Sequence, residues 1–209
     1  MSEMITISRK PRIVGVMGSH GEEPQVREAA RLLGEAIARR GHVLLTGGGT
    51  GLMRAASEGA YGAGGLVIGI LPNDRQRPME GYPNEFVDIA IFTGMYEARN
   101  VINAKTPHCL IALAGGAGTL SEIALALRAG TPVIALNAPE ISFGGAETIC
   151  RVASVEEALR AMDRILAGGR TRPGLDHGEI PADDSETVPR IQGALVKKSP
   201  PRRKPGSST

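Results

Sequence analysis

Residues 110–122 read LIALAGGAGTLSE and pass from an apolar run, through a glycine-rich turn, into a helical pattern. The run over residues 109–113 predicts a buried strand, and the periodicity that follows predicts a helix over residues 120–129. The first N–H groups of a helix have no partner within it, and the helix dipole adds positive potential beside them. This stretch therefore predicts a turn that binds a phosphate group.

Five residues of the stretch are candidate site residues. Gly115, Gly116 and Gly118 have no Cβ and let the backbone approach an anion closely. Thr119 could cap the helix or donate its hydroxyl to the same anion. Glu122 lies one turn further on, where it could carry the chemistry. As an ordinary acid of a first helical turn it would instead contribute only about 0.3–1 kcal/mol to stability.

Short apolar runs and helical patterns alternate on both sides of this stretch. Strands are expected over residues 12–17, 42–45, 66–71, 86–92, 109–113, 132–136 and 148–152, and helices over residues 25–40, 50–63, 95–104, 120–129 and 155–166. Residues 73–85 are polar, contain two prolines and predict an irregular loop near the ligand. Buried strands that alternate with helices predict an α/β, Rossmann-like fold, a doubly wound parallel sheet.

Length and composition predict one domain followed by a tail. The chain has 209 residues, of which 42% are hydrophobic, and a formal net charge of +2. Residues 1–167 hold 16 basic and 17 acidic residues, whereas residues 168–209 hold 8 and 5, lose all periodicity and collect Pro and Ser. We expect the second segment to be a disordered basic tail. The near-neutral domain disfavours nucleic acid as a partner. The basic tail could contact nucleic acid or membrane, but a solvated tail is the favoured interpretation, so we expect no membrane partner.

Several classes of protein are disfavoured by what the sequence lacks. Its 2 cysteines and 4 histidines form no cluster with metal-ligand spacing, so no metal site is expected. The first residues lack the apolar core of a signal peptide, and no apolar run is long enough to span a membrane. We therefore expect a cytoplasmic protein.

Two more glycine-rich turns, residues 15–21 and 47–51, follow predicted strands and should lie at the same sheet edge. They add the candidate ligand-binding residues Gly18, Ser19, Gly47, Gly48, Gly49 and Thr50. No Walker-type phosphate loop occurs, and the first turn is not G-x-G-x-x-G. The second strand ends near Thr46 rather than at the acid that a dinucleotide site uses for the ribose, which disfavours NAD.

Three motifs together resemble the LOG superfamily of Rossmann-like proteins. They are TGGGTGLM at residues 46–53, Met95-x-x-x-Arg99-Asn100, and GGxGTxxE at residues 115–122. The resemblance covers residues 12–137. Residues 93–100 and 120–124 look more like the branch that contains molybdenum-cofactor carrier proteins. The hydrolase branch usually has Pro where this chain has Ala114, and Lys where it has Asn100.

The resemblance implies two alternatives. In the first, the protein hydrolyses the N-glycosidic bond of nucleoside 5′-monophosphates to free base and ribose 5-phosphate. Glu122 would stabilise charge or activate water, Arg99 would hold the phosphate or ribose and help to orient Glu122, and residues 47–50 and 115–119 would grip the phosphate. In the second, the same turns bind molybdenum cofactor, or a similar phosphorylated cofactor, as cargo without catalysis.

The resemblance also implies a homodimer or larger homo-oligomer and no required cofactor. The name "lysine decarboxylase-like", often attached to the superfamily, does not suit this chain. A pyridoxal phosphate enzyme needs a Schiff-base lysine. Before the tail the chain offers only Lys10 and Lys105, and Lys105 precedes a strand instead of following one.

Overall fold

The computed structural model describes residues 5–20, 23–140 and 149–168. These residues fall within one compact unit, residues 1–174. The predicted tail lies outside the described residues, apart from its first residue.

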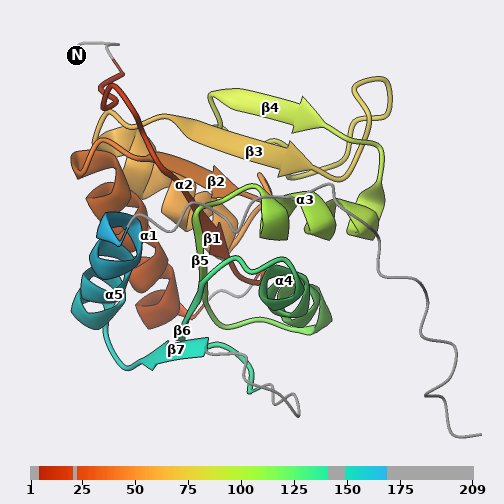
Figure 1. Cartoon of the computed structure of the whole chain (residues 1–209). Coiled ribbons are helices and arrows are strands. Elements are labelled where there is room, and N and C mark those ends of the chain that lie inside the picture. The colour runs from red at the N-terminus through yellow and green to blue at the C-terminus, as the bar shows by residue number, and fades with distance from the viewer. Residues whose placement is uncertain (1–4, 21–22, 141–148, 169–209) are drawn as a thin grey trace, which may run out of the picture. The chain divides into compact units, whose positions relative to one another are not determined.

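The described residues form a seven-stranded parallel sheet with the order β4-β3-β2-β1-β5-β6-β7. Figure 1 shows this order from β4 at the top to β7 at the bottom. The strands are β1 (Ile13–Met17), β2 (Val43–Thr46), β3 (Val67–Leu71), β4 (Ile89–Phe92), β5 (Cys109–Ala112), β6 (Val133–Leu136) and β7 (Ile149–Val152). The predicted α/β doubly wound fold is confirmed, and the last predicted strand forms an edge of the sheet.

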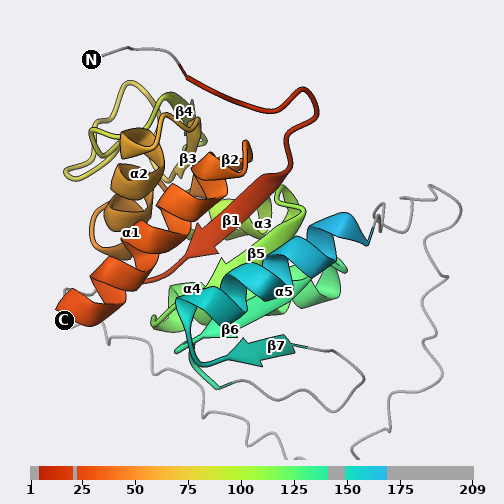
Figure 2. The ribbon, with the colours of Figure 1, turned by 90° about the vertical axis from the view of Figure 1, so that its left-hand side faces the viewer.

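Helices cover both faces of the sheet. They are α1 (Pro24–Arg39), α2 (Leu52–Gly62), the 3-10 helix η1 (Tyr96–Arg99), α3 (Asn100–Lys105), α4 (Ala117–Arg128) and α5 (Val155–Ala167). Figure 2 shows α1, α2 and α5 in front of the sheet, with α3 and α4 behind it. Ser154 caps α5, because its side chain accepts a hydrogen bond from the Glu157 N–H.

Alternate residues of each central strand enter one of two apolar cores. In β5, Cys109 and Ile111 pack on the side of α1, α2 and α5. Leu110 and Ala112 pack with Ile123 of α4 on the other side. This two-residue period is expected of a strand covered on both faces.

The order of the strands places a crevice beside β1. The chain builds outward from β1 to β4 and then returns to place β5 on the other side of β1. Loops that leave the carboxyl ends of β1 and β5 therefore run in opposite directions. Ligands of doubly wound sheets bind at such a point.

The predicted helix over residues 120–129 is wrong at its start. Gly116 is the residue before the helix, and α4 begins at Ala117, so Gly118 and Thr119 lie in its first turn. Thr119 consequently does not cap the helix. The small residues 116–118 look like a turn in the sequence, but their backbone is free to enter the helix directly.

Two other predicted elements are shorter or divided. Residues 86–88 precede β4 instead of starting it, because the Phe86 N–H binds the Asn84 side chain and the Val87 N–H binds the Asn84 carbonyl in a local turn. The helix predicted over residues 95–104 is divided into η1 and α3.

The described residues include neither a membrane-spanning helix nor a cluster of metal ligands. No helix among them has the length and apolar character needed to cross a membrane. Nor do three or more of their His, Cys, Asp and Glu residues gather where they could hold a metal ion.

Candidate functional site

A cleft of about 250 Å³ lies at the carboxyl ends of β1 and β5. The cleft therefore lies beside β1, where the loops that follow β1 and β5 run in opposite directions. The lining residues are Met17, Gly18, Ser19, His20, Met53, Tyr82, Arg99, Asn100, Gly116, Gly118, Thr119 and Glu122. Residues from five separate parts of the chain therefore meet at one place.

The first turn of α4 forms one wall of this cleft. Gly116 and Gly118 both line it, and a Cβ on either would meet nothing within 4 Å. Thr119 is buried against Gly115, where a Cβ would lie 2.0 Å from the Thr119 Oγ1. The start of α4 thus lies beside open space, as an anion site at a helix start requires.

Glu122 is a buried acid in the wall of the cleft. Its side chain is on α4, the residue is 7% exposed, and its Oε1 accepts a hydrogen bond of 2.8 Å from the Asn103 Nδ2. Burial raises the pKa of Glu122 to about 7, against the smaller lowering effects of the Asn103 hydrogen bond and the positive charge of Arg99. Near neutral pH the group can therefore exist as acid or carboxylate, which general acid–base chemistry needs.

Arg99 also lines the cleft and is held in place by backbone carbonyl groups. The residue is 8% exposed, and its Nη1 donates to the Gly47 carbonyl at 2.5 Å and to the Ile70 carbonyl. Its guanidinium carbon also lies 5.5 Å from the centre of the Tyr82 ring. The strand ends of β2 and β3 thus fix a positive charge in the cleft, whereas the hydrogen bond that orients Glu122 comes from Asn103 and not from Arg99.

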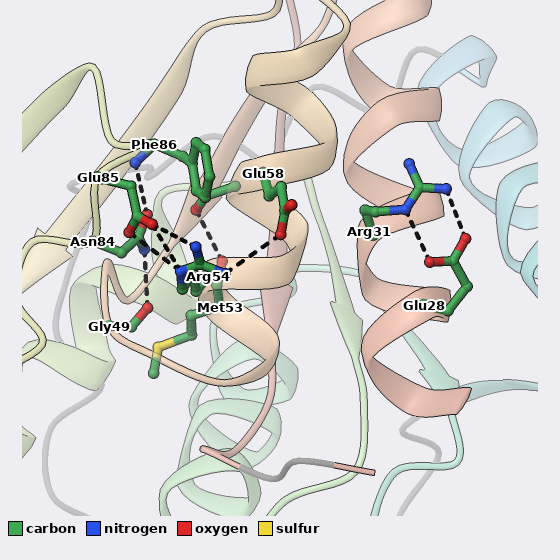
Figure 3. Close-up of polar contacts among 10 residues, drawn as sticks. Glu28, Arg31, Gly49, Met53, Arg54, Glu58, Asn84, Glu85 and Phe86 are labelled. Carbon is green, nitrogen blue, oxygen red and sulfur yellow. Dashed lines mark hydrogen bonds and ion pairs between the residues drawn. The ribbon is translucent and has the colours of Figure 1, made fainter. Parts of the chain in front are cut away.

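The triple glycine after β2 anchors the segment of residues 73–85. The Asn84 N–H donates to the Gly48 carbonyl at 2.8 Å, and the Asn84 Nδ2 donates to the Gly49 carbonyl at 2.9 Å. Figure 3 shows this side-chain bond beside the ion pair of Arg54 with Glu85, whose closest atoms are 2.5 Å apart. These contacts hold the segment that carries Tyr82 against the cleft.

His20 and Tyr82 form the outer rim of the cleft. The His20 Nδ1 lies 2.8 Å from the Thr50 Oγ1, and its Nε2 lies 3.4 Å from the Tyr82 hydroxyl. Their rings meet edge to face, with centroids 6.3 Å apart. This rim is aromatic, in contrast to the polar wall at α4.

The structure brings together most of the residues predicted for the site. Those in the lining are Gly18, Ser19, Arg99, Gly116, Gly118, Thr119 and Glu122. Beside the cleft, outside its lining, lie Gly47, Gly48, Gly49, Thr50 and Gly115. Three of these serve the lining residues: Gly47 binds Arg99, Thr50 contacts His20, and Gly115 leaves room for Thr119.

Sequence reasoning missed Asn103 and the part played by Tyr82. Asn103 follows Arg99 by four residues, a spacing that places both on one side of a helical segment and could have indicated a shared site. Tyr82 belongs to a segment without regular structure, and no pattern of the sequence predicts where it lies.

Some chains of similar sequence are named as phosphoribohydrolases. A cytokinin riboside 5′-monophosphate phosphoribohydrolase of Arabidopsis thaliana is 36% identical over 124 residues, which are 57% of this chain and 52% of that protein. An uncharacterized protein of Archaeoglobus fulgidus is 42% identical over 131 residues, 63% of this chain and 83% of the other. The chain thus matches about half the length of the Arabidopsis hydrolase.

Solved structures show the same fold. The molybdenum cofactor binding protein of Rippkaea orientalis is 38% identical, with a TM-score of 0.69 over 76% of this chain and 99% of that one. The molybdenum cofactor carrier protein of Chlamydomonas reinhardtii is 38% identical, with a TM-score of 0.66 and the same coverage. A family model described as the SLOG cluster4 family matches residues 11–165. The chain belongs to the SLOG cluster4 family.

Proposed function

We propose that the cleft binds a phosphorylated, nucleotide-like ligand and that the protein hydrolyses the N-glycosidic bond of a nucleoside 5′-monophosphate. The observation that carries this proposal is Glu122, a buried carboxyl group with a pKa raised to about 7 in the wall of the cleft. Carboxyl groups perturbed by burial and aimed at a cleft are typical of catalytic sites.

The two walls of the cleft suit the two ends of such a ligand. In this proposal the phosphate binds the N–H groups of the first α4 turn and the fixed positive charge of Arg99, which lines the same cleft. The base lies toward the aromatic rim formed by His20 and Tyr82. The ribose then lies between them, which brings its anomeric carbon to Glu122.

Glu122 would act first as a base and then as an acid. As a carboxylate it takes a proton from water, whose oxygen forms a bond to the anomeric carbon. The bond from that carbon to the base nitrogen breaks, and its electron pair stays on the nitrogen. The proton held by Glu122 can then pass to the departing base. Water and nucleotide give free base and ribose 5-phosphate, and the positive charge that develops on the sugar is stabilised by the carboxylate.

A second function, as a carrier of molybdenum cofactor, is favoured by a different observation. The similar solved structures named for that cofactor are covered over 99% of their length, whereas the hydrolase of Arabidopsis is covered over half. The carrier function would use the same phosphate-binding turn and the same Arg99, and it would not need Glu122 to exchange protons.

The test measures, by chromatography, the release of free base from a panel of nucleoside 5′-monophosphates. We expect wild-type protein to release base, and Glu122→Gln to reduce the rate at least 100-fold while ligand affinity changes less than about threefold. Glu85→Gln is the matched control, because Glu85 is an exposed acid paired with Arg54 away from the cleft lining. No release from any nucleotide, together with a pterin found by mass spectrometry in the purified protein, would favour the carrier.

A further inference from the structure

Asn103 presents an unusual hydrogen-bonding pattern at the buried side of Glu122. The residue is 0% exposed, and its Nδ2 donates to the Glu122 Oε1. Its other end, Oδ1, is also buried and has no hydrogen-bond partner among the described residues. A buried acceptor without a partner is destabilising, so its retention needs a reason.

The chemistry of the Asn103 and Glu122 side chains supplies a reason for keeping this unpartnered acceptor. An ionised carboxyl group only accepts hydrogen bonds, whereas a protonated one carries an O–H donor. An amide has a donor at one end and an acceptor at the other, in nearly the same shape, and a half-turn of its last side-chain bond exchanges them. Asn103 therefore carries, beside Glu122, a suitable partner for each form of the acid.

We infer that Asn103 is a positioning residue that holds the Glu122 carboxyl group in one place in both of its protonation states. Its Nδ2 donates to the carboxylate, and after a half-turn its Oδ1 accepts from the carboxylic acid. This inference rests on the proposed function for its purpose, since a group that takes and returns a proton must stay aligned with the sugar throughout. Its contacts do not depend on that function.

The surroundings of Glu122 assign this role to Asn103. Arg99 from η1 is the charged group that acts on the carboxyl group, and it is held by the Gly47 and Ile70 carbonyls. His20 and Tyr82 lie at the rim of the same cleft and contact each other. Among the described residues, the hydrogen bond to the carboxyl group comes from Asn103.

The experiment is a titration of Glu122 in the full-length protein, with ¹³C-labelled glutamate carboxyl groups followed by NMR and the signal assigned with Glu122→Gln. We expect a midpoint near pH 7 in the wild type. Asn103→Leu keeps a similar volume but removes the hydrogen bond to both forms of the acid. Because the bond to the charged carboxylate is the stronger of the two, the midpoint should rise by about one pH unit. The Asn103 side-chain amide nitrogen should itself titrate with the same midpoint as Glu122 in the wild type.

Thr131→Val is the matched control. Thr131 is also buried, and its Oγ1 also lacks a partner among the described residues. It precedes β6, however, and so lies at the amino-terminal ends of the strands, whereas the cleft lies at their carboxyl ends. This variant should leave the Glu122 midpoint within about 0.2 pH units of the wild type. If Asn103→Leu does not fold, Asn103→Asp tests the same contact. Two acids at this distance should share a proton and titrate in two coupled steps.

The outcomes separate this inference from the proposed function. An unchanged Glu122 midpoint in folded Asn103→Leu, an Asn103 amide signal that ignores pH, or a single uncoupled step in Asn103→Asp would overturn the positioning role. A shifted midpoint in a protein that releases no base would leave the positioning role in place and reject hydrolysis. If the protein does hydrolyse nucleotides, the acid limb of its kcat profile should move with the NMR midpoint.

Discussion

At the scale of single residues, the buried carboxyl group of Glu122 links the chemistry of the cleft to the stability of the fold. Burial raises its pKa from an ordinary value of 4.5 to about 7. Between these values the folded protein keeps the proton while the unfolded chain releases it. The free energy of unfolding therefore falls as the pH rises from 4.5 to about 7. Above pH 7 the buried carboxylate lowers it by about 3 kcal/mol.

Glu122→Gln should consequently stabilise the protein in alkaline solution while abolishing the proposed activity. We expect a gain of about 2–3 kcal/mol in the free energy of unfolding at pH 8 and almost none at pH 4. Urea unfolding at both pH values measures it. Glu85→Gln should show no such gain, since the pKa of Glu85 is lowered, chiefly by its hydrogen bond with Arg54. An equal gain at both pH values would show that ionisation of Glu122 does not limit stability.

Gly47 tests how strictly the Arg99 charge is positioned. A Cβ there would lie 2.6 Å from the Arg99 Nη1 and 2.7 Å from the Met53 Sδ, so Gly47→Ala must displace the guanidinium from its carbonyl partners. We expect a loss of stability of about 1–3 kcal/mol and at least tenfold weaker nucleotide binding by calorimetry. Gly62→Ala is the control, because a Cβ at the end of α2 meets nothing within 4 Å and should add up to about 1 kcal/mol. Unchanged nucleotide affinity in Gly47→Ala would remove Arg99 from the binding site.

At the scale of elements, the sequence predicted those strands and helices whose positions depend on local patterns of apolar residues. The apolar runs predicted the position of each strand in the sequence to within a few residues, because burial on both faces requires them to be apolar. The start of α4 was missed, since the Gly-Ala-Gly sequence at residues 116–118 permits a turn or a helix. The first residues of the predicted fourth strand were also wrong. A turn at Asn84, made by its own side chain and carbonyl, overrides the strand preference of Phe86 and Val87.

Asn84 should determine how firmly the segment of residues 73–85 is held. Its side chain donates to the Gly49 carbonyl and accepts from the Phe86 N–H, and the residue is 5% exposed. We expect Asn84→Ala to cost about 1–3 kcal/mol and to speed amide hydrogen exchange in residues 79–87. Glu85→Gln removes a largely exposed ion pair of the same segment and should cost less than about 1 kcal/mol. Exchange rates that stay at wild-type values in Asn84→Ala would show that other contacts hold the segment.

At the scale of the whole molecule, the site is a product of topology. Arg99 reaches Gly47 across 52 positions of the sequence, and Asn103 reaches Glu122 across 19. The sequence could predict the edge of the sheet at which these residues meet, because carboxyl strand ends of a parallel sheet share one edge. It could not predict which side chains touch. Those contacts depend on how η1 and α3 pack against α4 and β3, for which no local pattern exists.

The predicted homodimer is also a property of the whole molecule, and the surface suggests where it would form. Of the nine large hydrophobic residues exposed among the described residues, five fall between positions 89 and 101: Ile89, Ile91, Met95, Tyr96 and Val101. They lie on the edge strand β4, on η1 and its approach, and on α3, which also carries Asn103. Apolar side chains concentrated on one exposed segment are typical of a surface that binds another protein chain.

We therefore expect the protein to form a dimer through residues 89–101. Light scattering after size-exclusion chromatography should give twice the chain mass of 21.9 kDa. Ile91→Glu should raise the dimer dissociation constant at least tenfold, because it places a charge in an apolar interface. Leu32→Glu on α1, a similarly exposed apolar site away from this segment, should leave the dimer intact. A monomeric wild type, or a dimer disrupted by Leu32→Glu but not by Ile91→Glu, would reject this interface. Because η1 and α3 also position Arg99 and Asn103, a dimer formed here would stabilise the arrangement of residues that line the cleft. Ile91→Glu should then weaken nucleotide binding as well.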